Sequence, residues 1–182
     1  MSLLAIHVLG DPVLRRETEP VEAITAELQR LIDDMFETMQ AAKGVGLAAP
    51  QIGVSRRVAV VDVGVESGPP LVLINPRIVE SSDEVETAEE GCLSIPEIYG
   101  EVERPYAVVL EALDRNAKPY RVATTGFQAR AVQHEIDHLD GILFLDRLSA
   151  VRRSLLLSKW KKQRKGQTGF VKEVTPEPAG EL

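Results

Sequence analysis

Apolar residues recur at intervals of three and four along residues 21–43, and this spacing predicts an amphipathic helix that ends at Gly44. A second helix is expected to begin after an N-cap at Thr125 and to end near Leu139. Residues 148–164 predict a third helix, which is amphipathic and ends in the basic stretch KWKKQRK. The inward-facing positions of the second helix are expected to be Phe127, Ala131, His134, Ile136 and His138.

Between the first two helices, short runs of apolar and β-branched residues predict strands at 57–63, 71–76, 77–86, 106–114 and 119–125. The sequence DRNAKP between the last two runs predicts a hairpin turn. This order of elements predicts an α+β fold, in which a mostly antiparallel sheet packs around the second helix, with N-terminal and C-terminal helices outside it. Polar residues after Gly166 predict a flexible tail over 167–182, so that residues 1–166 form one domain.

Composition narrows the class of protein. The chain has 182 residues, of which 44% are hydrophobic and 27% charged, as is typical of a soluble globular protein. Its apolar runs fall short of the roughly 20 residues that cross a bilayer. The N-terminus has no basic region before its apolar stretch and no small-residue cleavage site, so a cytoplasmic protein is expected. The net charge of −7 argues against specific DNA binding, and no membrane partner is expected.

The stretch QHEIDHLDG, at 133–141, carries candidate chemistry on the second predicted helix. His134 and His138 are four positions apart, so that their imidazoles can face one metal ion from the same side of the helix. Glu135 lies beside them, close enough to handle the protons of a water molecule at the ion. The alternative is a surface helix that happens to carry two histidines. The apolar neighbours Val132 and Ile136 are unlike those of a solvated face.

A catalytic zinc-type site needs a third protein ligand and one open position. Downstream candidates fail, because Phe144 stands where the metzincin pattern has its last histidine. Upstream, Cys92 lies in the polar stretch EEGCLSIPE, and a thiolate is a strong ligand for transition metals. His7 is the other candidate; its short apolar surroundings favour a structural role. The predicted ligands are therefore Cys92, His134 and His138.

Three stretches in this order resemble the motifs of the peptide deformylase family, bacterial type. They are GVGLAAPQIG at 44–53, EGCLSIP at 90–96 and QHEIDHLDG at 133–141, and the similarity extends over residues 5–150. The resemblance implies a metal-dependent hydrolase that removes the N-terminal formyl group from formyl-methionine of newly synthesised polypeptides and releases formate.

The resemblance also implies roles for individual residues. Cys92, His134 and His138 match the metal ligands, and Glu135 matches the general acid and base. The side-chain amide of Gln51 and the backbone N–H of Leu93 match the groups that stabilise the oxyanion. The residues implied in substrate binding are Val45, Gly46 and Gly91 through their backbones, Arg104 on the substrate side, and Val45, Phe127, Arg130 and Ala131 around the methionine. The implied metal is Fe²⁺, with Zn²⁺, Ni²⁺ or Co²⁺ as substitutes.

Alternatives from other classes stay open on the sequence alone. A zincin-type peptidase shares the histidine pair, but it leaves Cys92 without a role and lacks its downstream ligand here. A binding module with a structural metal would close all four coordination positions, and the chain offers three convincing ligands. The basic end of the third helix could contact the ribosome, or it could simply be solvated and complement the helix dipole.

Overall fold

A computed structural model describes residues 2–176 of the chain, with three α-helices, nine strands and three short 3-10 turns in this range. The helices are α1 (Ala26–Ala41), α2 (Gly126–Leu139) and α3 (Ala150–Gln163). The strands are β1 (Ile6–His7), β2 (Gly46–Ala48), β3 (Val58–Val61), β4 (Leu71–Ser81), β5 (Val85–Cys92), β6 (Ile95–Pro105), β7 (Ala107–Leu113), β8 (Pro119–Thr125) and β9 (Val171–Lys172). The 3-10 turns are η1 (Pro12–Arg15), η2 (Ala49–Ile52) and η3 (Phe144–Arg147).

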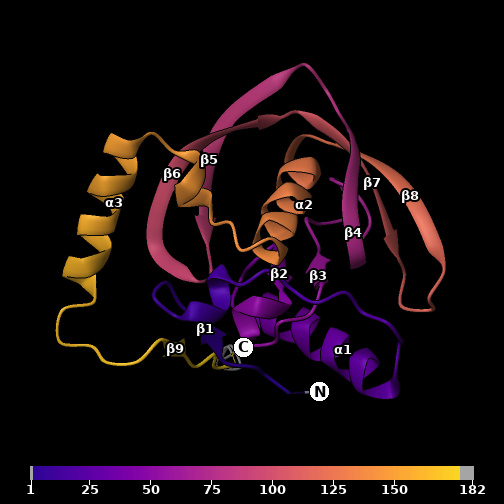
Figure 1. Cartoon of the computed structure of the whole chain (residues 1–182), viewed down its shortest axis with the longest axis horizontal. Coiled ribbons are helices and arrows are strands. Elements are labelled where there is room, and N and C mark those ends of the chain that lie inside the picture. The colour runs from indigo at the N-terminus through magenta and orange to yellow at the C-terminus, as the bar shows by residue number, and fades with distance from the viewer. Residues whose placement is uncertain (1, 177–182) are drawn as a thin grey trace, which may run out of the picture.

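The strands form three antiparallel groups around α2. The largest is a five-stranded sheet in the order β2-β3-β4-β7-β8, the second is the β5–β6 hairpin, and the third is the short pair β1–β9. Helix α2 runs between the hairpin and the five-stranded sheet, while α1 and α3 lie on the outside (Figure 1). The predicted α+β fold with a central helix is therefore confirmed.

Helix α2 is buried on most of its circumference. Val132 and Leu139 pack against the five-stranded sheet, where alternate strand residues such as Leu73 and Leu110 point inward. A separate apolar cluster joins the β5–β6 hairpin to η3 and α3 around Phe144. Polar side chains on such a helix must find partners or perform a function, because burying an unpaired polar group is costly. Glu135, Asp137 and His138 are all buried.

The first helix is shorter than the periodicity predicted. It begins after Thr25, whose hydroxyl accepts a hydrogen bond from the backbone N–H of Leu28 and so caps the helix. Residues before Thr25 are held outside the helix, since the side chain of Asn75 bonds both the N–H and the C=O of Val21. In α2, Phe127 was predicted to face inward and is instead 52% exposed.

The boundary predicted between strands 71–76 and 77–86 was wrong. Residues 71–81 form the single strand β4, which passes through register shifts on either side of Arg77. The chain then turns and continues as β5, so the predicted second run contains a turn. Strand β6 was missed. Its core-facing residues Ile98 and Val102 alternate with glutamates, and Pro96 interrupts the pattern near its start.

The chain turns back after α3. The C=O of Phe170 accepts a hydrogen bond from Val8, and β9 pairs with β1. Residues 170–172 thus have regular structure where the sequence predicted a flexible tail, and residues 177–182 of that predicted tail lie outside the described residues. Between residues 2 and 176, no helix has both the length and the apolar character needed to cross a membrane.

Gly141 ends α2 in a conformation that other residues resist. Its φ angle is +73°, and a Cβ atom there would lie 2.6 Å from the backbone oxygen of Arg15. We expect Gly141→Ala to lower the free energy of unfolding by about 3 kcal/mol, from left-handed strain and steric overlap together. Urea denaturation measures this loss. Gly64→Ala is the matched control: it has a φ of +88° with open space around it, and should cost only about 1 kcal/mol. Equal losses of unfolding free energy at both positions would show that overlap with the backbone of Arg15 adds nothing to the left-handed strain.

Candidate metal centre and active-site cavity

The three predicted metal ligands meet in the structure, although they come from two elements. Cys92 ends β5, and His134 and His138 lie one turn apart on α2. The Sγ of Cys92 lies 3.2 Å from the Nε2 of His138, which lies 3.1 Å from the Nε2 of His134. All three donor atoms lie within 4.8 Å of one another.

This donor set fits a divalent transition metal. Ligands bonded to one tetrahedral ion at their usual bond lengths lie about 3.3–3.6 Å apart, close to the separations in the cluster. One thiolate and two imidazoles are donors that such ions prefer. Three protein ligands also leave a coordination position for a reacting molecule, as catalytic sites require. His7, the other histidine, is hydrogen-bonded to Asp11 at 2.7 Å and is not part of the cluster.

Glu90 orients one of the ligands. Its carboxylate Oε1 lies 2.9 Å from the Nδ1 of His134, so that the Nε2 of His134 is left to face the cluster. Burial by itself would raise the pKa of Glu90, but the hydrogen bonds from Arg104 and His134 lower it well below its usual range. Glu90 is therefore a buried carboxylate. Glu90 stands two positions before Cys92, but nothing in the local sequence indicates this contact with His134.

Glu135 lies beside the cluster with a free carboxylate edge. Its side chain is buried, lines the cavity described below, and has no hydrogen-bond partner for Oε2 among the described residues. Burial raises the pKa of Glu135 to about 7. A carboxyl group with such a pKa can both accept and deliver a proton near neutral pH, as general acid–base catalysis requires.

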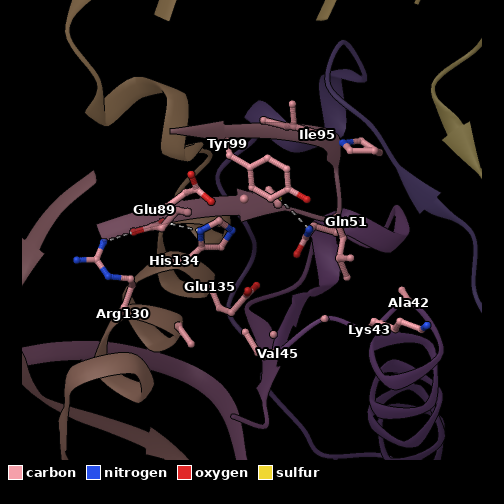
Figure 2. Close-up of a pocket in the computed structure, with 18 of the residues that line it drawn as sticks. Ala42, Lys43, Val45, Gln51, Glu89, Ile95, Tyr99, Arg130, His134 and Glu135 are labelled. Carbon is pink, nitrogen blue, oxygen red and sulfur yellow. Dashed lines mark hydrogen bonds and ion pairs between the residues drawn. The ribbon is translucent and has the colours of Figure 1, made fainter. Parts of the chain in front are cut away.

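Gln51 is fixed on the opposite wall by hydrogen bonds at both ends of its amide. Its Oε1 accepts from the backbone N–H of Ala48 at 2.9 Å, and its Nε2 donates to the hydroxyl of Ser94 at 3.1 Å. The same Nε2 lies 3.5 Å from the Sγ of Cys92. The amide is thus held next to the metal ligands. Figure 2 shows Gln51 and Glu135 among the side chains that line the same cavity.

These groups line one cavity of about 510 Å³. Its lining includes Cys92, Leu93, His134, Glu135 and Gln51 at the cluster. It also includes the residues predicted to bind the substrate, namely Val45, Gly46, Gly91, Phe127, Arg130 and Ala131. The structure therefore brings all but one of the predicted substrate-binding residues to the same cavity. It adds Tyr99, a large exposed side chain that the sequence analysis did not single out and that lies at the mouth in Figure 2.

The exception is Arg104, which was predicted on the substrate side. Its side chain is 2% exposed, does not line the cavity, and bonds to Glu90 and Asp137 behind the metal ligands. Arg104 is not placed to touch a substrate. Arg104 lies outside the three motifs, and the sequence around it could not reveal this, because both acidic partners come from other elements.

The close approach of Gly46 to Glu135 gives a test of the cavity floor. A Cβ at Gly46 would lie 2.8 Å from the Cδ of Glu135 and closer still to its Oε1. We expect Gly46→Ala to push the carboxylate out of place and to lower kcat by about 10²-fold, as small misplacements in an active site do. Steady-state kinetics on a formylated peptide would measure the loss. The matched control is Gly64→Ala, at which a Cβ meets nothing and kcat should not change. Unchanged kcat in Gly46→Ala would show that Glu135 need not occupy this position.

Comparison with known proteins places the chain in a family. The sequence profile of the polypeptide deformylase family matches residues 3–154, a range that contains the whole metal cluster. The chain belongs to the polypeptide deformylase family. The family's known reaction is the removal of the N-terminal formyl group from new polypeptides, so the predicted family, hydrolase class and reaction are confirmed.

Individual deformylases are similar over most of their length. The peptide deformylase of Rhizobium meliloti (strain 1021) is 49% identical over 167 residues, which cover 91% of this chain and 96% of that protein. The crystal structure of a peptide deformylase from Legionella pneumophila is 44% identical, with a TM-score of 0.85 and coverage of 91% and 98%. The peptide deformylase from Ehrlichia chaffeensis in complex with actinonin is 41% identical, with a TM-score of 0.86 and coverage of 92% and 100%.

Proposed function

We propose that this deformylase hydrolyses the formamide of an N-terminal formyl-methionine with the ligand cluster and the neighbouring cavity residues Gln51, Leu93 and Glu135, which all belong to the single catalytic domain predicted at 1–166. The observation that carries the proposal is the partly buried cluster of Cys92, His134 and His138, which shares a cavity with the carboxylate of Glu135. Three donor atoms within 4.8 Å and an adjacent proton acceptor are what hydrolysis of an unreactive amide requires.

Cys92, His134 and His138 would hold one divalent ion. When bound, the ion would supply Lewis-acid activation of water and of the formyl oxygen. We propose Fe²⁺ as the native ion, with Zn²⁺, Ni²⁺ or Co²⁺ as substitutes. The single thiolate and two imidazoles accept all four metals, since these are borderline ions with similar ligand preferences.

Glu135 would take a proton from the attacking water and deliver it to the amine that leaves. Its raised pKa, about 7, suits both transfers. The carbonyl oxygen of the formyl group becomes negatively charged during attack, and two N–H donors would stabilise it. These are the amide of Gln51, already oriented by Ala48 and Ser94, and the backbone N–H of Leu93. Loss of one such donor typically costs about 2.7–4 kcal/mol in transition-state stabilisation.

The substrate chain would lie between the 45–46 segment and the end of β5. Backbone groups of Val45, Gly46 and Gly91 line the cavity on its two sides, so an extended peptide can pair with them as an added strand. The methionine side chain would enter the part of the cavity formed by Phe127, Arg130 and Ala131. Arg130 offers its hydrocarbon stem there, because its guanidinium is bonded to Glu90 and to the C=O of Val102.

Formate release from a formyl-Met-Ala-Ser peptide tests the proposed function. The protein is purified without oxygen and supplied with Fe²⁺ or Ni²⁺, and formate is measured with unformylated Met-Ala-Ser as the control substrate. Release from the formylated peptide alone supports the proposal. A folded, metal-loaded protein that releases no formate would refute it.

If iron is the native ion, activity should decay in air and should persist when Ni²⁺ or Co²⁺ is bound instead. The reason is that oxygen readily oxidises Fe²⁺, beside the thiolate of Cys92 in the open cavity, whereas Ni²⁺ and Co²⁺ held there resist this oxidation. Paired time courses in air and under argon, with the bound metal quantified at each point, measure the decay. Activity that stays constant in air with iron still bound would count against iron.

The substrate suggests where the enzyme works and what it meets. We propose that it acts in the cytoplasm on chains that emerge from the ribosome. The last turn of α3 carries Lys161 and Lys162, and Arg164 and Lys165 follow directly, so this end could touch ribosomal RNA transiently. Salt-dependent cosedimentation with ribosomes tests the contact. Charge-reversed Lys161→Glu/Lys162→Glu protein should not cosediment if this end makes it.

A further inference from the structure

The metal ligands belong to two separate elements, and their alignment needs a physical cause. Cys92 is carried by the β5–β6 hairpin and the two histidines by α2. A metal ion tolerates errors of only about 0.2 Å in its bond lengths. A small sliding of the hairpin along the helix would therefore separate the sulfur from the imidazoles.

Arg104 bonds to both elements at once. Its Nε and Nη2 donate to the two oxygens of Glu90, at 2.5 and 2.9 Å, and its Nη1 donates to Asp137 at 2.9 Å. Glu90 lies two residues before Cys92 on β5, and Asp137 lies directly before His138 on α2. The guanidinium thus spans the gap between the ligand-bearing strand and the ligand-bearing helix.

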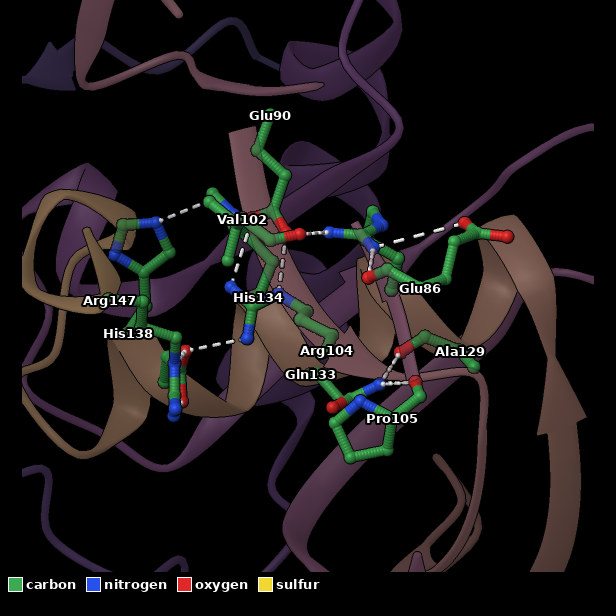
Figure 3. Close-up of polar contacts among 12 residues, drawn as sticks. Glu86, Glu90, Val102, Arg104, Pro105, Ala129, Gln133, His134, His138 and Arg147 are labelled. Carbon is green, nitrogen blue, oxygen red and sulfur yellow. Dashed lines mark hydrogen bonds and ion pairs between the residues drawn. The ribbon is translucent and has the colours of Figure 1, made fainter. Parts of the chain in front are cut away.

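Glu90 also connects Arg104 to one of the proposed metal ligands, His134. The same Glu90 carboxylate is hydrogen-bonded to the Nδ1 of His134 and accepts a further bond from Arg130 at 2.7 Å. Figure 3 shows Glu90 between His134 and Arg104, with Arg147 farther out beside His138. Arg147 makes two bonds to Asp137, at 2.6 and 2.7 Å, and its side chain is 42% exposed.

A contribution to stability alone is a weak explanation for these buried charges. Removing charges from water costs about as much as their mutual attraction returns, so apolar residues of the same volume often stabilise a core equally well. The planar guanidinium instead offers fixed donor directions, which a flexible or apolar side chain lacks. Its fork matches the carboxylate of Glu90 with both oxygens bonded.

We propose that Arg104 is a positioning residue, which fixes the strand carrying Cys92 against the helix carrying the two histidine ligands. The inference rests on the proposed metal site. Arg104 touches neither the substrate cavity nor the ligand atoms, so its effect is on metal affinity and on coordination geometry rather than on substrate binding.

The experiment compares Arg104→Met with Arg104→Lys, and Arg147→Met serves as the matched control. Arg147→Met removes a guanidinium from the same Asp137 but leaves the strand-to-helix link through Arg104 intact. Metal affinity is measured by competition with a chelator, and coordination geometry by the visible absorption spectrum of the Co²⁺-loaded protein. Thermal unfolding with and without metal shows how much each variant gains from the ion.

Arg104→Met should bind metal about 10–100-fold more weakly, as is typical when an outer-shell partner of a ligand is removed. Its Co²⁺ spectrum should change and its metal-dependent rise in Tm should shrink, while KM at saturating metal stays at the wild-type value. Arg104→Lys keeps the positive charge but loses the planar set of donors. Its metal affinity should therefore fall between those of the wild-type protein and Arg104→Met. Arg147→Met should retain the wild-type affinity and spectrum.

Equal metal affinities and spectra in Arg104→Met and Arg147→Met would overturn the inference. If both Arg104 variants fail to fold, Asp137→Ala removes the acceptor on the helix side of the link; unchanged affinity there would overturn the inference equally. Failure of the proposed function looks different, because the metal-loaded wild-type protein would then release no formate, whatever the metal affinities of the Arg104 variants.

Discussion

Replacing Glu135 by alanine is expected to lower kcat/KM for formyl-Met-Ala-Ser by about 10²–10⁴-fold while the metal stays bound. Glu135 is the carboxylate that lines the cavity beside the ligand cluster, and its Oε2 has no partner among the residues described here. Water at neutral pH is a poor nucleophile, and the thiolate of Cys92, as a ligand, would donate charge to the ion and so weaken its activation of that water. The enzyme therefore depends on a protein base.

Three variants make this test specific. Glu135→Gln keeps the volume and the polarity of the side chain but cannot accept the proton, so it should be as inactive as Glu135→Ala. Glu103→Gln makes the same chemical change at an exposed position on β6 outside the cavity, and should behave as wild type. Formate release gives kcat/KM, and elemental analysis confirms that all three retain metal. An active Glu135→Gln enzyme would remove Glu135 from the mechanism.

The metal site could be predicted from the sequence because most of its signal is local. Two histidines four residues apart face the same side of any helix, whatever surrounds it. Cys92 followed by elimination, since the residues downstream of His138 offered no ligand with suitable spacing. The three donor atoms do lie together, within 4.8 Å.

The network behind the site could not be predicted in the same way. Glu90, Arg104 and Asp137 are brought together by the pairing of β5 with β6 and by the contact of α2 with β6. No spacing in the sequence records that contact. Arg104 was consequently assigned to the substrate side, and Glu90 was overlooked although it adjoins a recognised motif residue. The strand β6 that carries Arg104 was missed for a related reason: its outward glutamates and Pro96 hide the alternation of its core residues.

The two ends of α1 also differ in how well the local sequence predicts them. The end of α1 follows from residues near it, and Gly44 was correctly predicted to lie beyond the helix. Its beginning has a local cause, the cap at Thr25, and also a distant one, Asn75, which bonds the backbone of Val21 and holds it outside the helix. Periodicity alone therefore made this helix too long.

Replacing Cys92 by serine is expected to weaken metal binding by more than about 100-fold, because outer-shell partners already contribute about 10–100-fold and Cys92 is proposed as a direct ligand. Serine preserves the shape of the side chain but offers an oxygen that stays protonated at neutral pH, whereas the thiolate is a strong donor to transition metals. Metal content after dialysis against a chelator measures the loss. In the Co²⁺-loaded protein, the absorption arising from the sulfur–metal bond should disappear.

His7→Asn is the matched control for this change, since His7 is the other residue that the sequence offered as a third ligand. It is bonded to Asp11 rather than to the cluster, so the variant should keep its metal and its Co²⁺ spectrum. Retention of metal by Cys92→Ser together with its loss from His7→Asn would reverse the ligand assignment. The expected opposite pattern would tie the metal to the junction of the β5–β6 hairpin with α2, where Glu90 and Arg104 align the two elements.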